Sequence, residues 1–366
     1  MTQKFKKFSS IGAFSNIVKN VRDHAKYNNI EVPSKVTFSG SCKLHGTNFC
    51  VALNPQGEVW FQSRERILCY ASDNAGSCTW GEQHVAEWKE IYRQICSAFN
   101  VDHDNFYVWG EWVGSKIQSG VALSQLKEKK FGIFKVAFVK SHFETVIRTI
   151  EGVVQEPVEE ETFVETLVDP VPWHDTINSL MSNVFVIDAI VPPVLIDIDF
   201  NEPHLVQNKL LELTLAVEAE CPVGKYFGIS GIGEGLVFST DQMGDQRYLY
   251  KVKGILHSSS KVKELRELTE AEITSKAGVA DFVEYACTEN RMKQGVDKLS
   301  EMGRPIIIQN LGTWIKWLGN DILSECQDTL VASGIERKDV MPKISEKAKN
   351  WFIRYLNSEM NLKEAA

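Results

Sequence analysis

The stretch Ser41–Cys50 combines the residue types best suited to chemistry in this sequence. Lys43 is followed by Leu-His-Gly-Thr-Asn, and apolar, β-branched runs on either side predict a bend between two strands. A lysine at such a bend can be directed into a pocket, and Gly46 lets the backbone approach a bulky ligand closely. K-x-x-G alone also occurs in surface turns, so Lys43 needs partners elsewhere in the chain to be a credible nucleophile.

Suitable partners lie about 200 residues downstream. Lys251 and Lys253 alternate along a strand-like run, so both point to one face, where they could meet phosphate. Glu234 begins another strand-like run, E-G-L-V-F. A lysine with a pKa near ~10.4 is almost fully protonated at neutral pH, and cations beside it favour the neutral, nucleophilic form. The same cations would stabilise charge that develops on a phosphate.

The order of these segments resembles that of the covalent nucleotidyltransferases. K-L-H-G-T-N resembles motif I of the RNA ligase 2 family, which includes phage and kinetoplastid ligases, whereas DNA ligases and capping enzymes usually have K-x-D-G. E-G-L-V-F and K-V-K resemble motifs IV and V, and the opening F-K-K-F-S-S-I is similar to that of the same family. Two further segments, G-E-W-V-G and F-G-I-F-K-V, resemble motifs III and IIIa.

The resemblance implies a role for each residue. Lys43 would attack the α-phosphorus of ATP with help from Glu234, Lys251 and Lys253, and Glu234 would also hold Mg²⁺ or Mn²⁺. The positions implied in nucleotide binding are Cys42, Leu44, His45, Asn48, Arg64, Glu111, Phe131, Glu234, Lys251 and Lys253.

Some of these assignments are more specific than others. Glu111 would accept hydrogen bonds from the ribose hydroxyls, and Phe131 would stack on adenine while Phe134 faces the core. Arg66 is a rival to Arg64, since both follow the same strand-like run. The chain departs from the family at Lys135, where an aspartate is usual, and at Cys42, where an acidic residue is common.

The helices and strands that we expect to position these residues form an α+β fold. We expect a ligase-type nucleotidyltransferase domain of antiparallel sheets with flanking helices over residues 1–257, and a small all-helical domain over 258–366. Residues 141–183 are acidic and proline-punctuated, and we interpret them as a variable insertion or solvated loop. Apolar spacing predicts a helix over Trp80–Phe99.

Composition limits the class of protein. A net charge of −8 excludes a uniformly basic nucleic-acid coat, so RNA would have to meet local patches such as Lys4–Lys7, Lys127–Lys135 or Lys251–Lys263. Eight cysteines without metal spacing indicate reduced thiols and no zinc site. We see neither a secretory signal nor a membrane-spanning run, and expect a monomer in the cytoplasm, the host cytoplasm if a phage encodes it.

The sequence therefore predicts an ATP-dependent RNA ligase that joins 3′-hydroxyl and 5′-phosphate ends, at nicks in duplex RNA, through lysyl-AMP and RNA-adenylate intermediates. The alternatives are an ATP-dependent DNA ligase, which His45 and the helical tail disfavour, and a nucleic-acid-binding protein on an inactive transferase core. A capping guanylyltransferase is disfavoured on the same grounds as a DNA ligase. Labelling of the protein by ATP would distinguish these alternatives.

Overall fold

The computed structural model describes residues 3–9, 11–146, 149–150, 153–154, 158–240, 248–254, 277–326, 329–330 and 335–364. Contacts divide the chain into unit 1 (Met1–Phe8, Leu44–Ser119 and Leu123–Pro192) and unit 2 (Ser9–Lys43, Gly120–Ala122 and Pro193–Ala366). The expected boundary between residues 257 and 258 lies outside the described residues, and the division by contacts follows a different line. Lys43 thus ends a segment of unit 2, and Leu44 begins one of unit 1.

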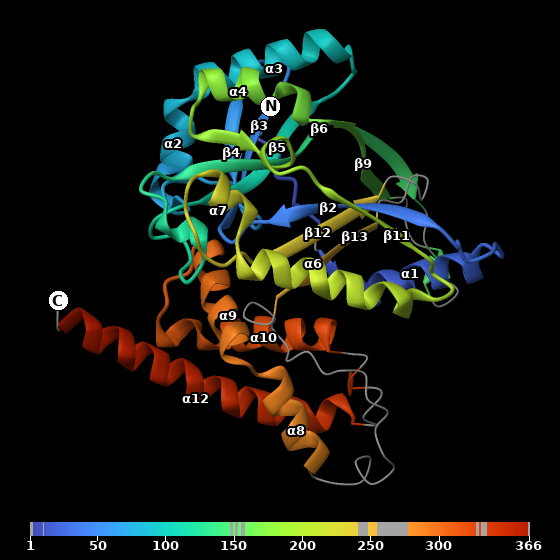
Figure 1. Cartoon of the computed structure of the whole chain (residues 1–366), viewed down its shortest axis with the longest axis vertical. Coiled ribbons are helices and arrows are strands. Elements are labelled where there is room, and N and C mark those ends of the chain that lie inside the picture. Colours follow the sequence, from blue (N-terminus) through green and yellow to red (C-terminus); the bar gives the residue numbers. More distant parts are fainter. Residues whose placement is uncertain are drawn as a thin grey trace. The chain divides into compact units, whose positions relative to one another are not determined.

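Unit 1 is built on a mostly antiparallel sheet in the order β10-β6-β5-β3-β4, with β9 also paired to β6 (Figure 1). Only the β10–β6 pair among these is parallel. The strands are β3 (Thr47–Leu53), β4 (Val59–Gln62), β5 (Asn105–Val113), β6 (Lys130–Val146), β9 (Val158–Val168) and β10 (Val184–Val186), with β7 (Thr149–Ile150) and β8 (Val153–Val154) forming a separate pair.

Helices cover one face of this sheet. They are α2 (Ser77–Gln83), α3 (Val85–Phe99), α4 (His174–Leu180) and α5 (Ile187–Ile190), with short 3-10 turns at η1 (Tyr70–Ser72), η2 (Ala122–Gln125) and η3 (Val171–Trp173). Trp88, Ile91 and Ile95 of α3 are buried against the strands, as the apolar spacing predicts. The expected helix over Trp80–Phe99 is in fact two helices, because the backbone of His84 leaves the helical conformation.

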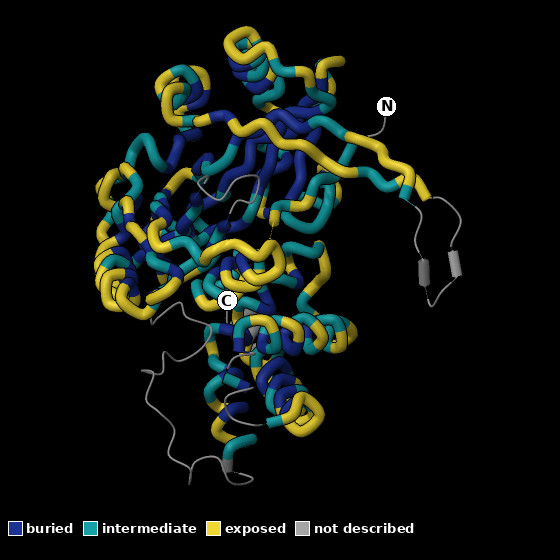
Figure 2. The backbone as a smooth tube through the Cα atoms, turned by 90° about the vertical axis from the view of Figure 1, so that its right-hand side faces the viewer, coloured by how far each residue is buried: buried dark blue, intermediate teal, exposed yellow. Residues whose placement is uncertain are grey.

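The region expected to be a solvated loop is largely a long hairpin. β6 continues to Val146 and pairs with β9 from Val136↔Val168 to Val146↔Val158, so a solvated loop is wrong for these strands, while a variable insertion stays a prediction. Alternation was hard to see because both strands are exposed at their far ends, which Figure 2 shows in yellow. A strand that buries neither face carries no period-2 signal.

Unit 2 contains a second sheet, in the order β1-β13-β12-β2-β11. Its strands are β1 (Gly12–Ala13), β2 (Val36–Lys43), β11 (Val194–Ile198), β12 (Gly235–Thr240) and β13 (Tyr248–Lys253). The helical segments beside it are α1 (Phe14–Tyr27), η4 (Pro203–Val206), α6 (Gln207–Ala219) and α7 (Pro222–Tyr226). Tyr250 of β13 stacks on Phe238 of β12, meets Phe38 of β2 edge-on and packs against Phe14 of α1, so it ties three adjacent strands to the helix.

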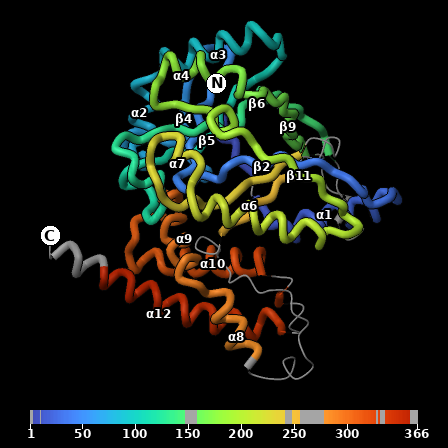
Figure 3. Tube along the Cα trace, viewed as in Figure 1, coloured from blue at the N-terminus to red at the C-terminus, as the bar shows by residue number. Residues whose placement is uncertain are grey.

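The C-terminal part of unit 2 is helical, as expected. It comprises α8 (Ala277–Ala286), α9 (Glu289–Glu301), η6 (Ile308–Asn310), α10 (Leu311–Glu325) and α12 (Arg337–Glu364), which Figure 3 shows in orange to red. Trp314, Leu318 and Ile322 of α10 are fully buried in its core. We call residues 277–364 the helical tail. The two sheets with flanking helices and this tail confirm the predicted α+β fold class.

Candidate active site

The strand register of unit 2 brings three separated motifs into one row. Gly235 on the central strand β12 pairs with Lys43 on β2 and with Lys253 on β13. Paired residues of neighbouring strands project to the same face of a sheet, so both lysines project to one side. Val237, two residues further along, pairs with Lys251, which therefore lies on that same side. The prediction that Lys251 and Lys253 share a face is confirmed.

Glu234 connects the two lysines of this row. It directly precedes β12, and its Oε2 accepts a hydrogen bond from Lys43 Nζ at 2.7 Å, while its Oε1 lies 2.9 Å from Lys253 Nζ. The Glu234 side chain is 2% exposed, against 20% for Lys43 and 13% for Lys253. A carboxylate so deeply buried is costly unless both oxygens are paired, and here both are.

The charges around Lys253 and Lys251 act in opposite directions. Burial disfavours the charged form of Lys253, but the carboxylates of Glu234, Glu325 and Asp321 together outweigh it and raise the pKa of Lys253. Burial lowers the pKa of Lys251, and the positive charge of Lys253 lowers it further. Lys251 instead pairs with Glu325 of the helical tail, whose Oε1 lies 2.8 Å from its Nζ. The row therefore brings three amines into contact with two carboxylates, Glu234 and Glu325.

Gly235 is required where β12 begins. Its φ is +148°, and a Cβ atom would lie 2.1 Å from the carbonyl oxygen of Val252. Any side chain would force β12 and β13 apart, because backbone atoms cannot move aside as a flexible side chain can. The glycine of E-G-L-V-F thus keeps Glu234 at the end of the row.

A second group of predicted residues lies in unit 1. The backbone N–H of Gly46 donates to Glu111 Oε1 at 3.1 Å, and Asn48 is opposite Glu111 in the β3–β5 register. Among the described residues, buried Asn48 Oδ1 has no hydrogen-bond partner. A buried acceptor without a donor is costly, and a ligand that donates to it would remove that cost.

Comparison with known families identifies the chain. The model of the RNA ligase family matches residues 37–253, more than half of the sequence, and this span contains the Lys43, Glu111, Glu234, Lys251 and Lys253 motifs. The chain belongs to the RNA ligase family. No protein with a curated description matches it.

Solved structures of RNA ligases resemble the chain at low identity. A Naegleria gruberi RNA ligase with PPi is 15% identical, with a TM-score of 0.38 over 69% of this chain and 56% of that chain. An archaeal ATP-dependent RNA ligase is 11% identical, with a TM-score of 0.36 over 97% of this chain and 67% of that one. The present RNA ligase family member thus spans little more than half the length of the Naegleria chain.

The position of Phe131 in the structure does not fit its expected role of stacking on adenine. Phe131 is fully buried and packs against Phe49 and Trp88, on the helix-covered face of the unit 1 sheet. Glu111 pairs with the next residue, Gly132, and so belongs to the opposite face. Stacking of Phe131 on a nucleotide held by Glu111 does not fit this geometry, and we withdraw that assignment in favour of a core role.

The alternation of β6 puts Phe131 and Phe134 on opposite faces, but in the reverse of their expected roles. The β5–β6 register shifts between Trp109 and Gly110, which leaves Phe134 without an opposite residue. Phe134 packs beside Trp109, on the face that also bears Glu111, and is only partly buried, so it does not face the main core as expected. Alternation from Phe131 already puts Phe134 on the face of Glu111, and the bulge changes the register only beyond this residue.

The residues next to Lys43 have unequal access. Cys42 is 4% exposed and alternates to the opposite face from Lys43, where its thiol hydrogen-bonds to Cys221. This bond lowers the pKa of Cys221 to about 7 against the effect of burial. Leu44 is also buried, whereas His45 is partly exposed. Only His45 of these three neighbours therefore has surface available for a nucleotide.

The two candidate arginines differ in their local bonding. Arg66 Nη1 donates to the carbonyl oxygen of Ser72 and so fastens the loop that follows β4. Arg64 is partly buried. The structure gives Arg66 a local structural role, and the assignment of Arg64 as the functional arginine stays a prediction.

The expected basic patch Lys4–Lys7 is already neutralised by glutamates. Lys4 pairs with Glu161, Lys6 with Glu165 at 3.1 Å, and Lys7 with Glu65 at 2.9 Å. This segment is therefore a poor surface for RNA phosphates. The Lys251–Lys263 patch extends outside the described residues.

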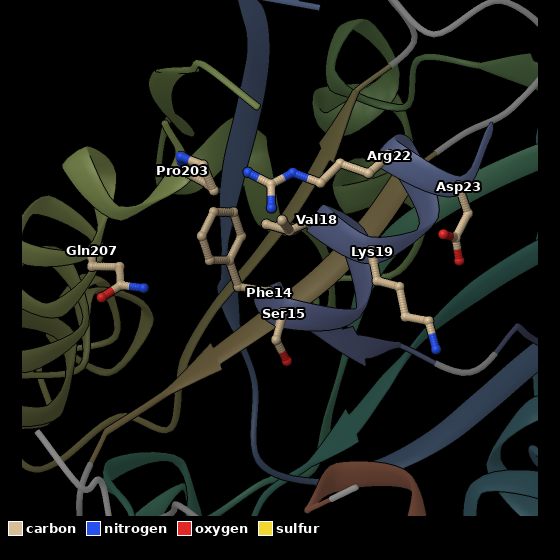
Figure 4. Close-up of a pocket in the computed structure, with 8 residues that line it drawn as sticks. All are labelled: Phe14, Ser15, Val18, Lys19, Arg22, Asp23, Pro203 and Gln207. Carbon is tan, nitrogen blue, oxygen red and sulfur yellow. The ribbon is translucent and has the colours of Figure 1, made fainter. Parts of the chain in front are cut away.

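The described part of the chain offers little else that competes with this site. No group of three His, Cys, Asp or Glu side chains there could hold a metal, and no described helix is long and apolar enough to cross a membrane. A cavity between α1 and η4 includes Phe14 and Arg22 but no predicted site residue (Figure 4). Arg22 donates to the carbonyls of Phe200 and Asn201, which gives it a structural task.

Proposed function

We propose that this chain is an ATP-dependent RNA ligase that joins a 3′-hydroxyl to a 5′-phosphate through lysyl-AMP and RNA-adenylate intermediates. The observation that carries the proposal is the Lys43–Glu234–Lys253 group, in which a candidate nucleophile contacts a buried carboxylate that also holds a second cation. Membership of the RNA ligase family supports the same chemistry.

In the first step Lys43 Nζ forms a bond to the α-phosphorus of ATP, and the bond from that phosphorus to the pyrophosphate oxygen breaks. Glu234 orients the amine, since its Oε2 already accepts from Nζ. Lys253 and Lys251 lie on the same sheet face and offer positive charge to the phosphates. The AMP then passes to an RNA 5′-phosphate, and attack by the 3′-hydroxyl seals the strand and expels AMP.

Glu234 is also the residue that would hold a divalent cation. Mg²⁺ usually keeps several waters and binds one or two carboxylates together with substrate phosphates, so a single carboxylate beside a phosphate site fits its ligand preference. Bound Mg²⁺ or Mn²⁺ would neutralise charge on the triphosphate. Lys43 and Lys253, which now occupy both oxygens of Glu234, would have to share the carboxylate with the ion.

We assign Glu111 and Asn48 to the nucleoside. A carboxylate can accept from both vicinal hydroxyls of a ribose, and Glu111 Oε1 already accepts the Gly46 N–H beside the Lys43 motif. Asn48 Oδ1, buried and without a partner among the described residues, is an acceptor for a hydroxyl or amino group. The alternative, an inactive core that only binds nucleic acid, does not explain why the chain has so complete a set of predicted catalytic and nucleotide-binding side chains.

The decisive test is incubation with α-labelled ATP and Mg²⁺. We expect label that survives denaturation of the protein and is released by acid, as a phosphoramidate requires, and no label from α-labelled GTP. A protein that stays unlabelled would favour the binding-module reading, and labelling by GTP would favour a capping-type enzyme. Sealing of nicked duplex, splinted and single-stranded RNA would then test the preference for nicks.

A further inference from the structure

The helical tail contains a buried arginine that organises two carboxylates. The Arg291 side chain is 0% exposed, and its Nε lies 2.9 Å from Asp321 Oδ2 and its Nη2 lies 3.0 Å from Glu325 Oε2. Asp321 and Glu325 are four residues apart on α10, so they share one helix face. Because a buried guanidinium needs compensation, both carboxylates are fixed where α9 and α10 pack together.

Glu325 extends this group to the sheet. Its second oxygen, Oε1, lies 2.8 Å from Lys251 Nζ, and the two side chains are 18% and 24% exposed. Glu325 therefore bridges a buried arginine of the tail and a lysine of the K-V-K strand. Asp321 contacts the same arginine, but no ion pair of Asp321 with Lys251 occurs among the described residues.

This contact neutralises the lysine that the proposed function needs. The triphosphate of ATP is strongly anionic. A carboxylate beside Lys251 accepts one of the hydrogen bonds that the ammonium group can donate, and its negative charge repels the incoming phosphates. Lys253 is held differently, since its ion-pair partner is Glu234, which directly precedes the neighbouring strand β12. Among the described residues, Lys251 is the lysine of K-V-K that forms an ion pair with the tail.

We propose that Glu325 is a positioning residue of the helical tail that holds Lys251 in the nucleotide-free chain and competes with the ATP triphosphate for it. The inference rests on the proposed function, in which Lys251 binds phosphate. The tail thereby weakens ATP binding without taking part in bond formation. ATP must displace Glu325 from Lys251 before the amine can serve the phosphates.

The test is the ATP dependence of lysyl-AMP formation in full-length variants. Glu325→Gln removes the charge but keeps the shape, and we expect the KM for ATP to fall roughly fivefold with an unchanged maximal rate. Asp321→Asn is the matched control, because it disturbs the same arginine and acts on Lys251 only at longer range, without an ion pair, so its KM should stay within about twofold of wild type. Glu325→Asp keeps the charge and should restore most of the wild-type KM.

A binding measurement separates this inference from the proposed function. Calorimetry with inorganic tripolyphosphate probes the lysines without any lysyl-AMP, and Glu325→Gln should bind it roughly fivefold more tightly than wild type. Equal binding by both proteins, a raised KM in Glu325→Gln, or equal shifts in Glu325→Gln and Asp321→Asn would each overturn the role of Glu325. If wild type forms no lysyl-AMP but Glu325→Gln still binds tripolyphosphate more tightly, the proposed function fails and this inference stands.

Discussion

Lys43 and Glu234 are 191 residues apart in the sequence, yet Lys43 Nζ donates to Glu234 Oε2 at 2.7 Å. The contact exists because β2 and β12 are neighbours whose register pairs Lys43 with Gly235. The proposed nucleophile, in contact with a buried carboxylate, has a defined orientation before substrate arrives. Alignment of the reacting atoms can raise a reaction rate by several orders of magnitude.

The first prediction concerns Lys43 as the covalent nucleophile. Lys43→Ala should lose all acid-labile AMP labelling, because the proposal assigns attack on the α-phosphorus to the Lys43 amine, and Lys253, the other amine that Glu234 contacts, to the phosphates. The same variant should still seal a nick that carries a pre-made 5′-adenylate, since that step needs no lysine nucleophile. Labelling that persists in the variant would refute the assignment.

Glu234→Gln should slow lysyl-AMP formation by about 100-fold or more, because the amide cannot neutralise two lysines or bind a divalent ion as a carboxylate does. Circular dichroism should show a retained fold. Glu165→Gln is the control, since Glu165 also pairs with two lysines, Lys6 and Lys135, but belongs to no catalytic motif. If both variants lose the same activity, loss of an ion pair in general explains the result.

Phe131 should matter for stability rather than for ATP affinity. Phe131→Ala should lower the free energy of unfolding by about 3–5 kcal/mol, because it opens a cavity among aromatic rings. Phe131→Leu, which keeps most of the volume, should leave the KM for ATP within about twofold of wild type. Phe134→Leu is the comparison on the face of Glu111. A large rise in KM in a well-folded Phe131→Leu protein would restore the stacking role.

Gly46 should not tolerate a side chain. A Cβ atom there would lie 2.3 Å from the carbonyl oxygen of Trp112 and 2.7 Å from Val113 Cγ1. Gly46→Ala should therefore cost roughly 1–3 kcal/mol of stability and disturb the N–H that Glu111 accepts, with loss of labelling by ATP. Gly312→Ala on α10 meets nothing within 4 Å and should be neutral or slightly stabilising in the same assays.

The last prediction concerns the strand that the enzyme demands. Contact with 2′-hydroxyls or A-form geometry is what distinguishes RNA from DNA, and a chain with a net charge of −8 cannot rely on bulk charge. Deoxynucleotides at the last one or two positions of the 3′-hydroxyl end should slow sealing by at least about tenfold, roughly 1.4 kcal/mol. The same change on the 5′-phosphate strand should do much less. Equal rates on all-DNA and RNA nicks would support a DNA ligase.

The sequence alone determined the features that depend on local pattern. Strand alternation placed Lys251 and Lys253 on one face, helical spacing placed Trp88, Ile91 and Ile95 against the core, and the motif order indicated the family. The two face assignments depend on residues only a few positions apart, so the geometry of a strand or a helix is enough to infer them.

Only the tertiary structure decided which distant residues meet and which face an aromatic ring takes. Strand β6 directs Phe134 to the face of Glu111 and Phe131 to the core, and the motif does not record which of the two faces is covered by helices. The contact of Glu325 with Lys251 likewise depends on the packing of α9 and α10 around Arg291. Such pairings depend on the free energy of the whole fold, because each joins segments that the chain separates by dozens of residues.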